Sequence, residues 1–166
     1  MSTWTELLDE LLSPDLEVVR DAAMRALPLG RAPEEIQQKI IPSLERFLTI
    51  PVTFSRSPAQ LLALQGEPGL SLLRTAAAQG HGAAIFTLGE FRDAKAVPYL
   101  LQALEADRSP GEAALALGKI GDLTALPAIR AWRKRASSAP QAMGNPSDAV
   151  LAEHALQLLL SSTRQT

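Results

Sequence analysis

The 166-residue sequence contains no cysteine, which excludes disulfide bonds, thiolate metal sites and cysteine nucleophiles. Phe, Trp and Tyr make up only 4% of the residues, and no Val-, Ile- and Thr-rich alternation supports β-strands. The formal net charge of −2 provides no overall positive field for binding phosphates. No apolar run approaches the roughly 18 residues that a membrane span needs. These absences favour a cytoplasmic, all-helical protein without a membrane contact.

The amino-terminal segment MSTWTELLDELLSPDLE is acidic and amphipathic. It lacks the basic and apolar regions of a signal peptide, which agrees with a cytoplasmic location. The residues that dominate the whole chain are Ala and Leu, which are good helix formers and allow helices to approach closely. Because 46% of the residues are hydrophobic, one continuous core within a single domain, residues 1–166, is expected.

An internal repeat appears when the chain is shifted by 29 positions from Gly82. Seven identities then fall within about twenty positions, and no gap is needed. The identical pairs are Gly82 and Gly111, Ala84 and Ala113, Leu88 and Leu117, Gly89 and Gly118, Asp93 and Asp122, Ala96 and Ala125, and Pro98 and Pro127. The strongest repeats are therefore residues 82–104 and 111–133.

Each repeat has the pattern of a helix, a tight turn and a second helix. Gly89 is expected near the end of the first helix, where glycine adopts a left-handed backbone at little cost. Asp93 is expected to cap the following helix by accepting hydrogen bonds from its free N–H groups. Pro98 belongs near the start of the second helix, where its missing N–H matters least.

Weaker versions of the same pattern precede and follow these two repeats. Apolar residues at helical spacing predict helices over 18–27 and 36–48, with Ile41-Pro42 as the counterpart of Val97-Pro98. A more degenerate pair covers 58–65 and 68–79. A loop rich in Ser, Pro, Gly and Asn is expected at 137–147, followed by an amphipathic terminal helix at 148–160.

The segments ALALGKIGDLTALPAI and AIFTLGEFRDAKAVPYL resemble HEAT repeats of the short bilin-lyase type. This resemblance implies stacked antiparallel helix pairs whose second helices line a concave face. Such repeats occur in bilin lyases and phycobilisome-associated proteins, and also in scaffolds and adaptors of unrelated role. The predicted fold is therefore an all-α solenoid of about four HEAT-like helix pairs with a terminal capping helix.

The last strong repeat departs from its predecessor at two positions. Under the 29-residue shift, Leu101 becomes Arg130 and Leu104 becomes Arg133. Burying an unpaired guanidinium group is very costly, so this side of the helix is expected to be exposed and to end the regular stack. With Lys134 and Arg135 these arginines form a basic patch, either a solvated end face with salt bridges or a site for an acidic or phosphate-bearing partner.

Tyr99, beside Gln102 on the polar side of its helix, is the best candidate for a contact on the concave face. The candidate binding residues are Tyr99, Gln102, Arg130, Arg133 and Lys134. No catalytic residue, cofactor or metal site is predicted, because the two histidines, His81 and His154, do not form the repeated His-Glu pairs of metal-dependent HEAT-like enzymes.

The predicted function is a non-enzymatic protein-interaction or scaffold module that binds a protein partner on its concave helical face. One alternative is an accessory factor or lyase-like component that acts on a bilin-bearing, phycobiliprotein-like partner. Another is weak phosphate or nucleic-acid binding through the basic patch. The sequence leaves the partner, the pathway and the oligomeric state open.

Overall fold

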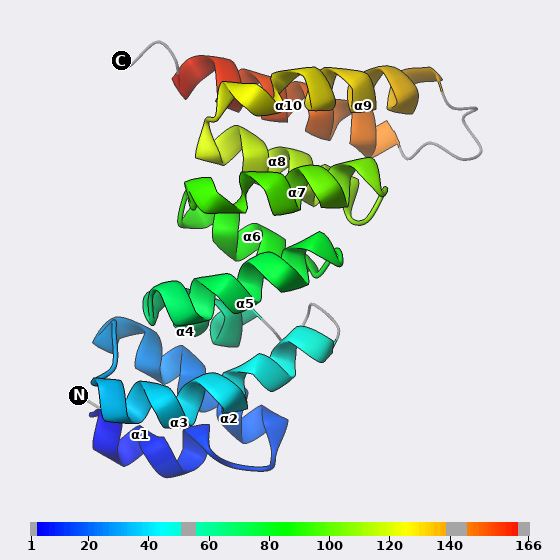
Figure 1. The fold of residues 1–166 in the computed structure, drawn as a ribbon. Helices are drawn as coiled ribbons and strands as arrows, with labels where there is room; N and C mark the ends of the chain where they lie inside the picture. The colour runs from blue at the N-terminus through cyan, green and yellow to red at the C-terminus, as the bar shows by residue number, and fades with distance from the viewer. Residues whose placement is uncertain (1–2, 51–55, 139–145, 163–166) are drawn as a thin grey trace. The chain divides into compact units, whose positions relative to one another are not determined.

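The computed structural model describes residues 3–50, 56–138 and 146–162. Within these ranges the secondary structure is helical, with no β-strand, so the predicted all-α fold is confirmed. The chain divides into two compact units, Met1–Ala76 and Ala77–Thr166. Figure 1 shows the helices of both units, and each unit is described here by itself. The single-domain organisation stays a prediction.

The described part of unit 1 contains five α-helices. They are α1 (Trp4–Leu11), α2 (Leu16–Ala26), α3 (Glu34–Glu45), α4 (Arg56–Leu64) and α5 (Glu67–Ala78), the last of which ends just past the unit boundary. Helix α1 packs on α2 and α3, and α4 packs on α2 and α3. A capping box at Thr3 and Glu6 starts α1, and Asp15 caps α2.

A buried amide supports the centre of unit 1. Gln65 is completely buried, and its Oε1 accepts a hydrogen bond of 2.9 Å from the backbone N–H of Ala32. Its Nε2 donates to the Leu61 carbonyl at 2.8 Å. The Ala32 carbonyl in turn accepts a hydrogen bond of 2.6 Å from Gln37 Nε2. These bonds satisfy polar groups that would otherwise be costly to bury, and they join the start of α3 to the end of α4.

Unit 2 contains the two strong repeats. Its helices are α6 (Gly82–Glu90), α7 (Val97–Glu105), α8 (Pro110–Ile120), α9 (Leu126–Ser138) and α10 (Pro146–Ser162). Helices α6, α8 and α10 pack in succession in one layer, and α7 and α9 contact each other in a second layer (Figure 1). Helix α7 also packs on α8, as α9 packs on α10. The stacking of similar helical hairpins is therefore confirmed within this unit.

The 29-residue register is exact in the turn of each hairpin. Short 3₁₀ turns span Ala94–Ala96 and Leu123–Ala125, and they lead directly into α7 and α9. Asp93 Oδ1 accepts a bond of 3.3 Å from the Lys95 N–H, and Asp122 Oδ1 accepts one of 2.9 Å from the Thr124 N–H. Both aspartates therefore act as the predicted caps.

The expected role of Gly89 is wrong. Its backbone is helical, and the left-handed residue of this turn is Arg92, whose φ is 49°. The equivalent residue in the next repeat is Gly121, with φ of 82°. Gly89 instead allows close helix packing, because a Cβ atom there would lie 2.9 Å from the Cα atom of Ala116. Sequence spacing alone does not distinguish these two uses of glycine.

Three predicted boundaries also change. Pro42 lies inside α3 and not at its start, because the helix already begins at Glu34, after Pro33, with two acidic residues in its first turn. Helices α9 and α10 extend into the predicted loop 137–147, and its residues 139–145 lie outside the described part of the chain. The terminal helix expected at 148–160 is contained within α10.

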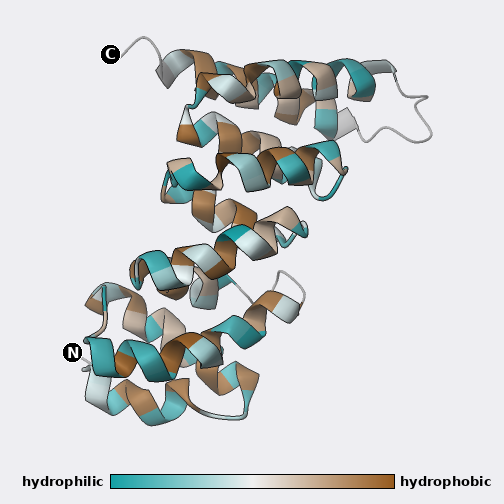
Figure 2. Cartoon of the chain, in the orientation of Figure 1, coloured by the Kyte–Doolittle hydropathy of each residue, from teal (hydrophilic) through white to brown (hydrophobic). Residues whose placement is uncertain are grey.

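Apolar side chains fill the interior of unit 2, where the helices carry both hydrophobic and hydrophilic stretches (Figure 2). The core is built mainly from Leu, Ile and Ala, with Trp132 only 3% exposed. Leu88 and Leu117, which are equivalent under the repeat, are both completely buried. Phe91 is the C-cap of α6 and is 40% exposed. The small residues of α6, α8 and α10 explain how these three helices pack so closely.

Candidate functional site

Two adjacent surfaces of unit 2 carry the candidate binding residues. The first, called here the α7–α9 surface, consists of Tyr99, Gln102 and Glu105 on α7 and of Ala131 and Lys134 on α9, all of them exposed. The second, called here the end face, lies on α9 and α10, the last two helices that the structure describes. It consists of Arg130, Arg133, Val150, Glu153 and Gln157.

The α7–α9 surface follows from the register of the repeat. A shift of 29 residues carries Gln102 to Ala131 and Glu105 to Lys134, so these positions form matching rows on two neighbouring helices. Tyr99 is 38% exposed, one turn before Gln102. Buried residues such as Leu100 and Leu104 hold the same helix in place from the other side. The exposed side chains are thus presented by packed helices and not by loops.

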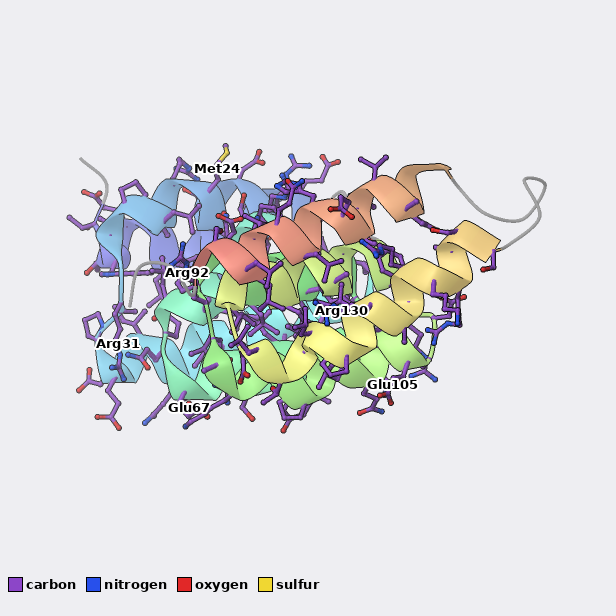
Figure 3. The ribbon with its side chains drawn as sticks, turned by 90° about the horizontal axis from the view of Figure 1, so that it is seen from above. Met24, Arg31, Glu67, Arg92, Glu105 and Arg130 are labelled. Atoms are coloured by element: carbon purple, nitrogen blue, oxygen red, sulfur yellow. The ribbon has the colours of Figure 1, made fainter. Side chains whose placement is uncertain are left out.

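The predicted basic patch divides between the two surfaces. Lys134 is the equivalent of Glu105 under the 29-residue shift and so belongs to the α7–α9 surface. Arg130, one turn before it, lies on the side of α9 that faces α10 (Figure 3). Arg133 also reaches α10, where its guanidinium donates to Glu153 Oε2 at 2.8 Å. The expectation that Arg130 and Arg133 are exposed, at positions occupied by leucines in the preceding repeat, is confirmed.

The pair formed by Arg133 and Glu153 is about half exposed on both sides. Solvent screening therefore limits its contribution to stability to roughly 0–1 kcal/mol. Its main consequence is electrostatic, because it neutralises one of the four cations of α9. Arg130 and Lys134 form no ion pair with any residue that the structure describes.

Sequence reasoning missed three members of the end face: Val150, Glu153 and Gln157. A second shift, of 39 residues, identifies them. It carries Ala113 to Ala152, Ala116 to Ala155 and Leu117 to Leu156, so that α10 becomes equivalent to α8. The longer spacing arises because α9 is longer than α7, because more residues separate α9 from α10 than α7 from α8, and because α10 begins earlier than α8 under this alignment. The change of spacing hides the relationship from a search at a constant period.

Local structure explains three other polar features of unit 2. His81 caps α6 through its Nδ1, which accepts a hydrogen bond of 3.3 Å from the Ala84 N–H. Hydrogen bonds from the side chain and backbone of Thr124 lower the pKa of Asp122 below its ordinary value. A small hollow of about 110 Å³ between α6 and α8 is bordered by Lys119, whose ammonium lies 5.0 Å from the centre of the Phe86 ring.

The described residues contain no group of three or more His, Cys, Asp or Glu side chains placed to hold a metal ion. In the same part of the chain, every helix is too short or too polar to cross a membrane.

A family model described as HEAT repeats matches residues 66–143, which include α5 to α9. No curated protein and no solved structure matches the chain. The matched stretch is thus similar to HEAT repeats, a class that generally mediates protein–protein interaction.

Proposed function

We propose that this chain is a non-enzymatic interaction module, with a scaffold role, that binds a protein partner on the α7–α9 surface. The observation that supports this most directly is the shared register of α7 and α9, which aligns exposed side chains on consecutive second helices. A rigid array of helices presents a broad surface at little conformational cost, which is how helical repeats generally bind proteins. The concavity of this surface and a cytoplasmic location remain predictions.

Tyr99 is the expected anchor of that contact. Tyrosine combines a large apolar ring with a hydroxyl group, and it is enriched among the residues that contribute most to binding energy. Gln102, one turn further along α7, adds an amide that both donates and accepts hydrogen bonds. Lys134 on α9 adds a positive charge about two turns along the matching row.

Affinity purification of the full chain from its native host tests the proposal. We expect a protein partner to be retained by the wild type and lost in the double variant Tyr99→Ala, Gln102→Ala. The matched control is Phe91→Ala, because Phe91 is an aromatic residue of similar exposure on the connection after α6. Retention by the double variant, or equal loss in the control, would contradict the proposed surface.

The basic residues favour phosphate or nucleic-acid binding as a second candidate function. Arg130 and Lys134 lack carboxylate partners among the described residues, and Arg135 lies beside them in the last turn of α9. Binding of this kind is strongly salt dependent because it releases counterions. Binding at low salt that is lost in a triple Ala variant of Arg130, Arg133 and Lys134 supports this function, and its absence at low salt removes it.

The bilin-lyase subtype of the repeat also belongs among the proposals. It implies a bilin-bearing partner, and the test is absorbance spectroscopy of the purified chain mixed with a free bilin. A shifted and strengthened bilin band that co-elutes with the chain supports this reading. An unchanged spectrum argues against it and leaves the protein-binding proposal intact.

A further inference from the structure

Helix α10 occupies the position of the first helix of a further hairpin. A Cβ atom added to Gly89 of α6 would lie 2.9 Å from the Cα atom of Ala116 in α8. A Cβ atom added to Gly118 of α8 would lie 2.7 Å from the carbonyl oxygen of Ala155 in α10. Ala116 and Ala155 are equivalent residues, and each contacts the equivalent glycine of the preceding first helix, Gly89 or Gly118. The contacts of α10 with α8 and α9 repeat those of α8 with α6 and α7.

In the earlier repeats, certain glycine and leucine positions pack one hairpin on the next. The equivalent positions of the end face carry polar residues. The residue equivalent to Gly89 and Gly118 in α10 is Gln157, which is exposed. Leu104, which is 1% exposed in α7, is replaced by Arg133 in α9, and Leu101 is replaced by Arg130. A further hairpin of the same sequence type therefore does not fit this end, because the side chain of Gln157 prevents the glycine-mediated contact.

The end face nevertheless offers features that bind a helix of different composition. Val150 is 68% exposed and Leu160 is 43% exposed, about three turns apart on α10. An open depression of about 370 Å³ on α10 is lined by Ala149, Val150, Glu153, His154 and Gln157, so that Val150 borders it. Exposed apolar side chains on a packed helix are the kind of contact that an amphipathic partner helix covers.

The charge of the end face favours an acidic occupant. Of the five residues that make up the end face, two are arginines and one is a glutamate, so its net charge is +1. Glu153 is already bound to Arg133, whereas Arg130 has no ion pair with a described residue. An exposed guanidinium without an ion pair binds a carboxylate through short, charge-assisted hydrogen bonds.

We propose that the end face receives an acidic, amphipathic helical segment of another protein, in the place where a further hairpin would stack. Its carboxylates bind Arg130, and its apolar side chains cover Val150 and Leu160. Because Gln157 replaces glycine, this helix lies at the ordinary interaxial distance of about 8–10 Å, which leaves room for longer side chains. The inference rests on the proposed protein-binding role and adds a second surface and the chemistry of the partner.

Selection from a displayed library of random helical peptides on the full chain tests this inference. Enriched peptides are then synthesised, and their affinities for purified variants are measured by fluorescence anisotropy. We expect the enriched peptides to be acidic, with apolar residues at helical spacing. Arg130→Glu should weaken their binding about tenfold or more, as reversal of a contacting charge does. Val150→Asp should weaken it by a similar factor.

The matched control is Lys134→Glu, which makes the same change in net charge on the same helix but on the α7–α9 surface. It should weaken peptide binding less than Arg130→Glu does, since Lys134 lies one turn from Arg130 on α9 and acts on the peptide only through solvent. Equal weakening by Lys134→Glu and Arg130→Glu, enrichment of peptides without acidic residues, or no enrichment at all would overturn the proposal. Circular dichroism establishes that each variant is folded.

Two other occupants give different outcomes. If a second copy of the chain covers the end face, analytical ultracentrifugation detects a dimer that Val150→Asp disrupts, and the inference is wrong. If Arg130 binds only inorganic phosphate, phosphate competes with the peptides and Val150→Asp leaves their affinity unchanged, and the inference is again wrong. Loss of a host partner in the Tyr99 and Gln102 double variant concerns the α7–α9 surface alone, so the two proposals fail separately.

Discussion

Substitution of Gly118 by Ala is expected to destabilise unit 2. The added Cβ atom would lie 2.7 Å from the carbonyl oxygen and 3.1 Å from the Cα atom of Ala155. Both of these atoms belong to the backbone of α10, so relief requires that two packed helices move apart. Overpacking of this kind costs about 1–3 kcal/mol, and the rigid neighbour favours the upper part of that range.

Alanine also stabilises a helix relative to glycine, by up to about 1 kcal/mol. The expected net change in the free energy of unfolding is therefore a loss of about 2 kcal/mol. The matched control is Gln157→Ala, at the equivalent position of α10, where the side chain is exposed. Its effect should stay within about 0.5 kcal/mol, as is usual for surface substitutions.

Urea denaturation measures both changes. Trp132 is buried in unit 2, so its fluorescence in a Trp4→Phe background follows the unfolding of that unit, and far-UV circular dichroism follows the helices. The reasoning is refuted if Gly118→Ala is neutral or stabilising. It is also refuted if Gln157→Ala is equally destabilising, because α10 would then not repeat the packing of α8.

Three further substitutions test other parts of the fold. Gly121→Ala places a side chain at φ of 82° and should lower the free energy of unfolding by about 1 kcal/mol, as urea denaturation would show. Asp122→Ala removes a cap and should cost about 1 kcal/mol at neutral pH. The folded-state pKa of Asp122 is lowered, so its contribution to the free energy of unfolding is complete above its ordinary pKa of 3.8 and is lost as the pH falls through the lowered value. An acid titration should therefore show the free energies of unfolding of the wild type and of Asp122→Ala becoming equal at low pH. Gln65→Leu leaves buried backbone groups without partners and should cost about 1–3 kcal/mol in thermal or urea unfolding.

The repeat explains why much of unit 2 was predictable from the sequence. Identical residues at a constant spacing perform the same local task, so the sequence alone predicts caps at Asp93 and Asp122, and both are present. The replacement of leucines by Arg130 and Arg133 indicated an exposed end because a buried, unpaired charge is too costly. Both conclusions depend on local chemistry, which a sequence records directly.

Other features depend on distant partners, which a single sequence does not reveal. The close approach at Gly89 requires Ala116 on another helix, and the burial of Gln65 depends on the backbone of Ala32. Helix α1 was also not among the expected helix pairs. Its contacts with α2 and α3 resemble those of α7 with α8 and α9, so it occupies the position of a second helix.

The candidate site was predicted only in part. Tyr99, Gln102 and the cations of α9 follow from exposure at known helical positions. Val150, Glu153 and Gln157 become visible only when α10 is aligned with α8, across a connection of different length. The pairing of Glu153 with Arg133 joins residues on separate helices, and neither residue type nor spacing indicates it.

Site-specific photo-cross-linking in cells of the native host tests the central claim most directly. A benzophenone amino acid replaces Tyr99 in one variant and Phe91 in the other, since these aromatic residues are 38% and 40% exposed. If the α7–α9 surface binds a protein, the probe at position 99 forms a discrete cross-linked product that is absent for position 91. No product at position 99, or the same product at both positions, would contradict the account.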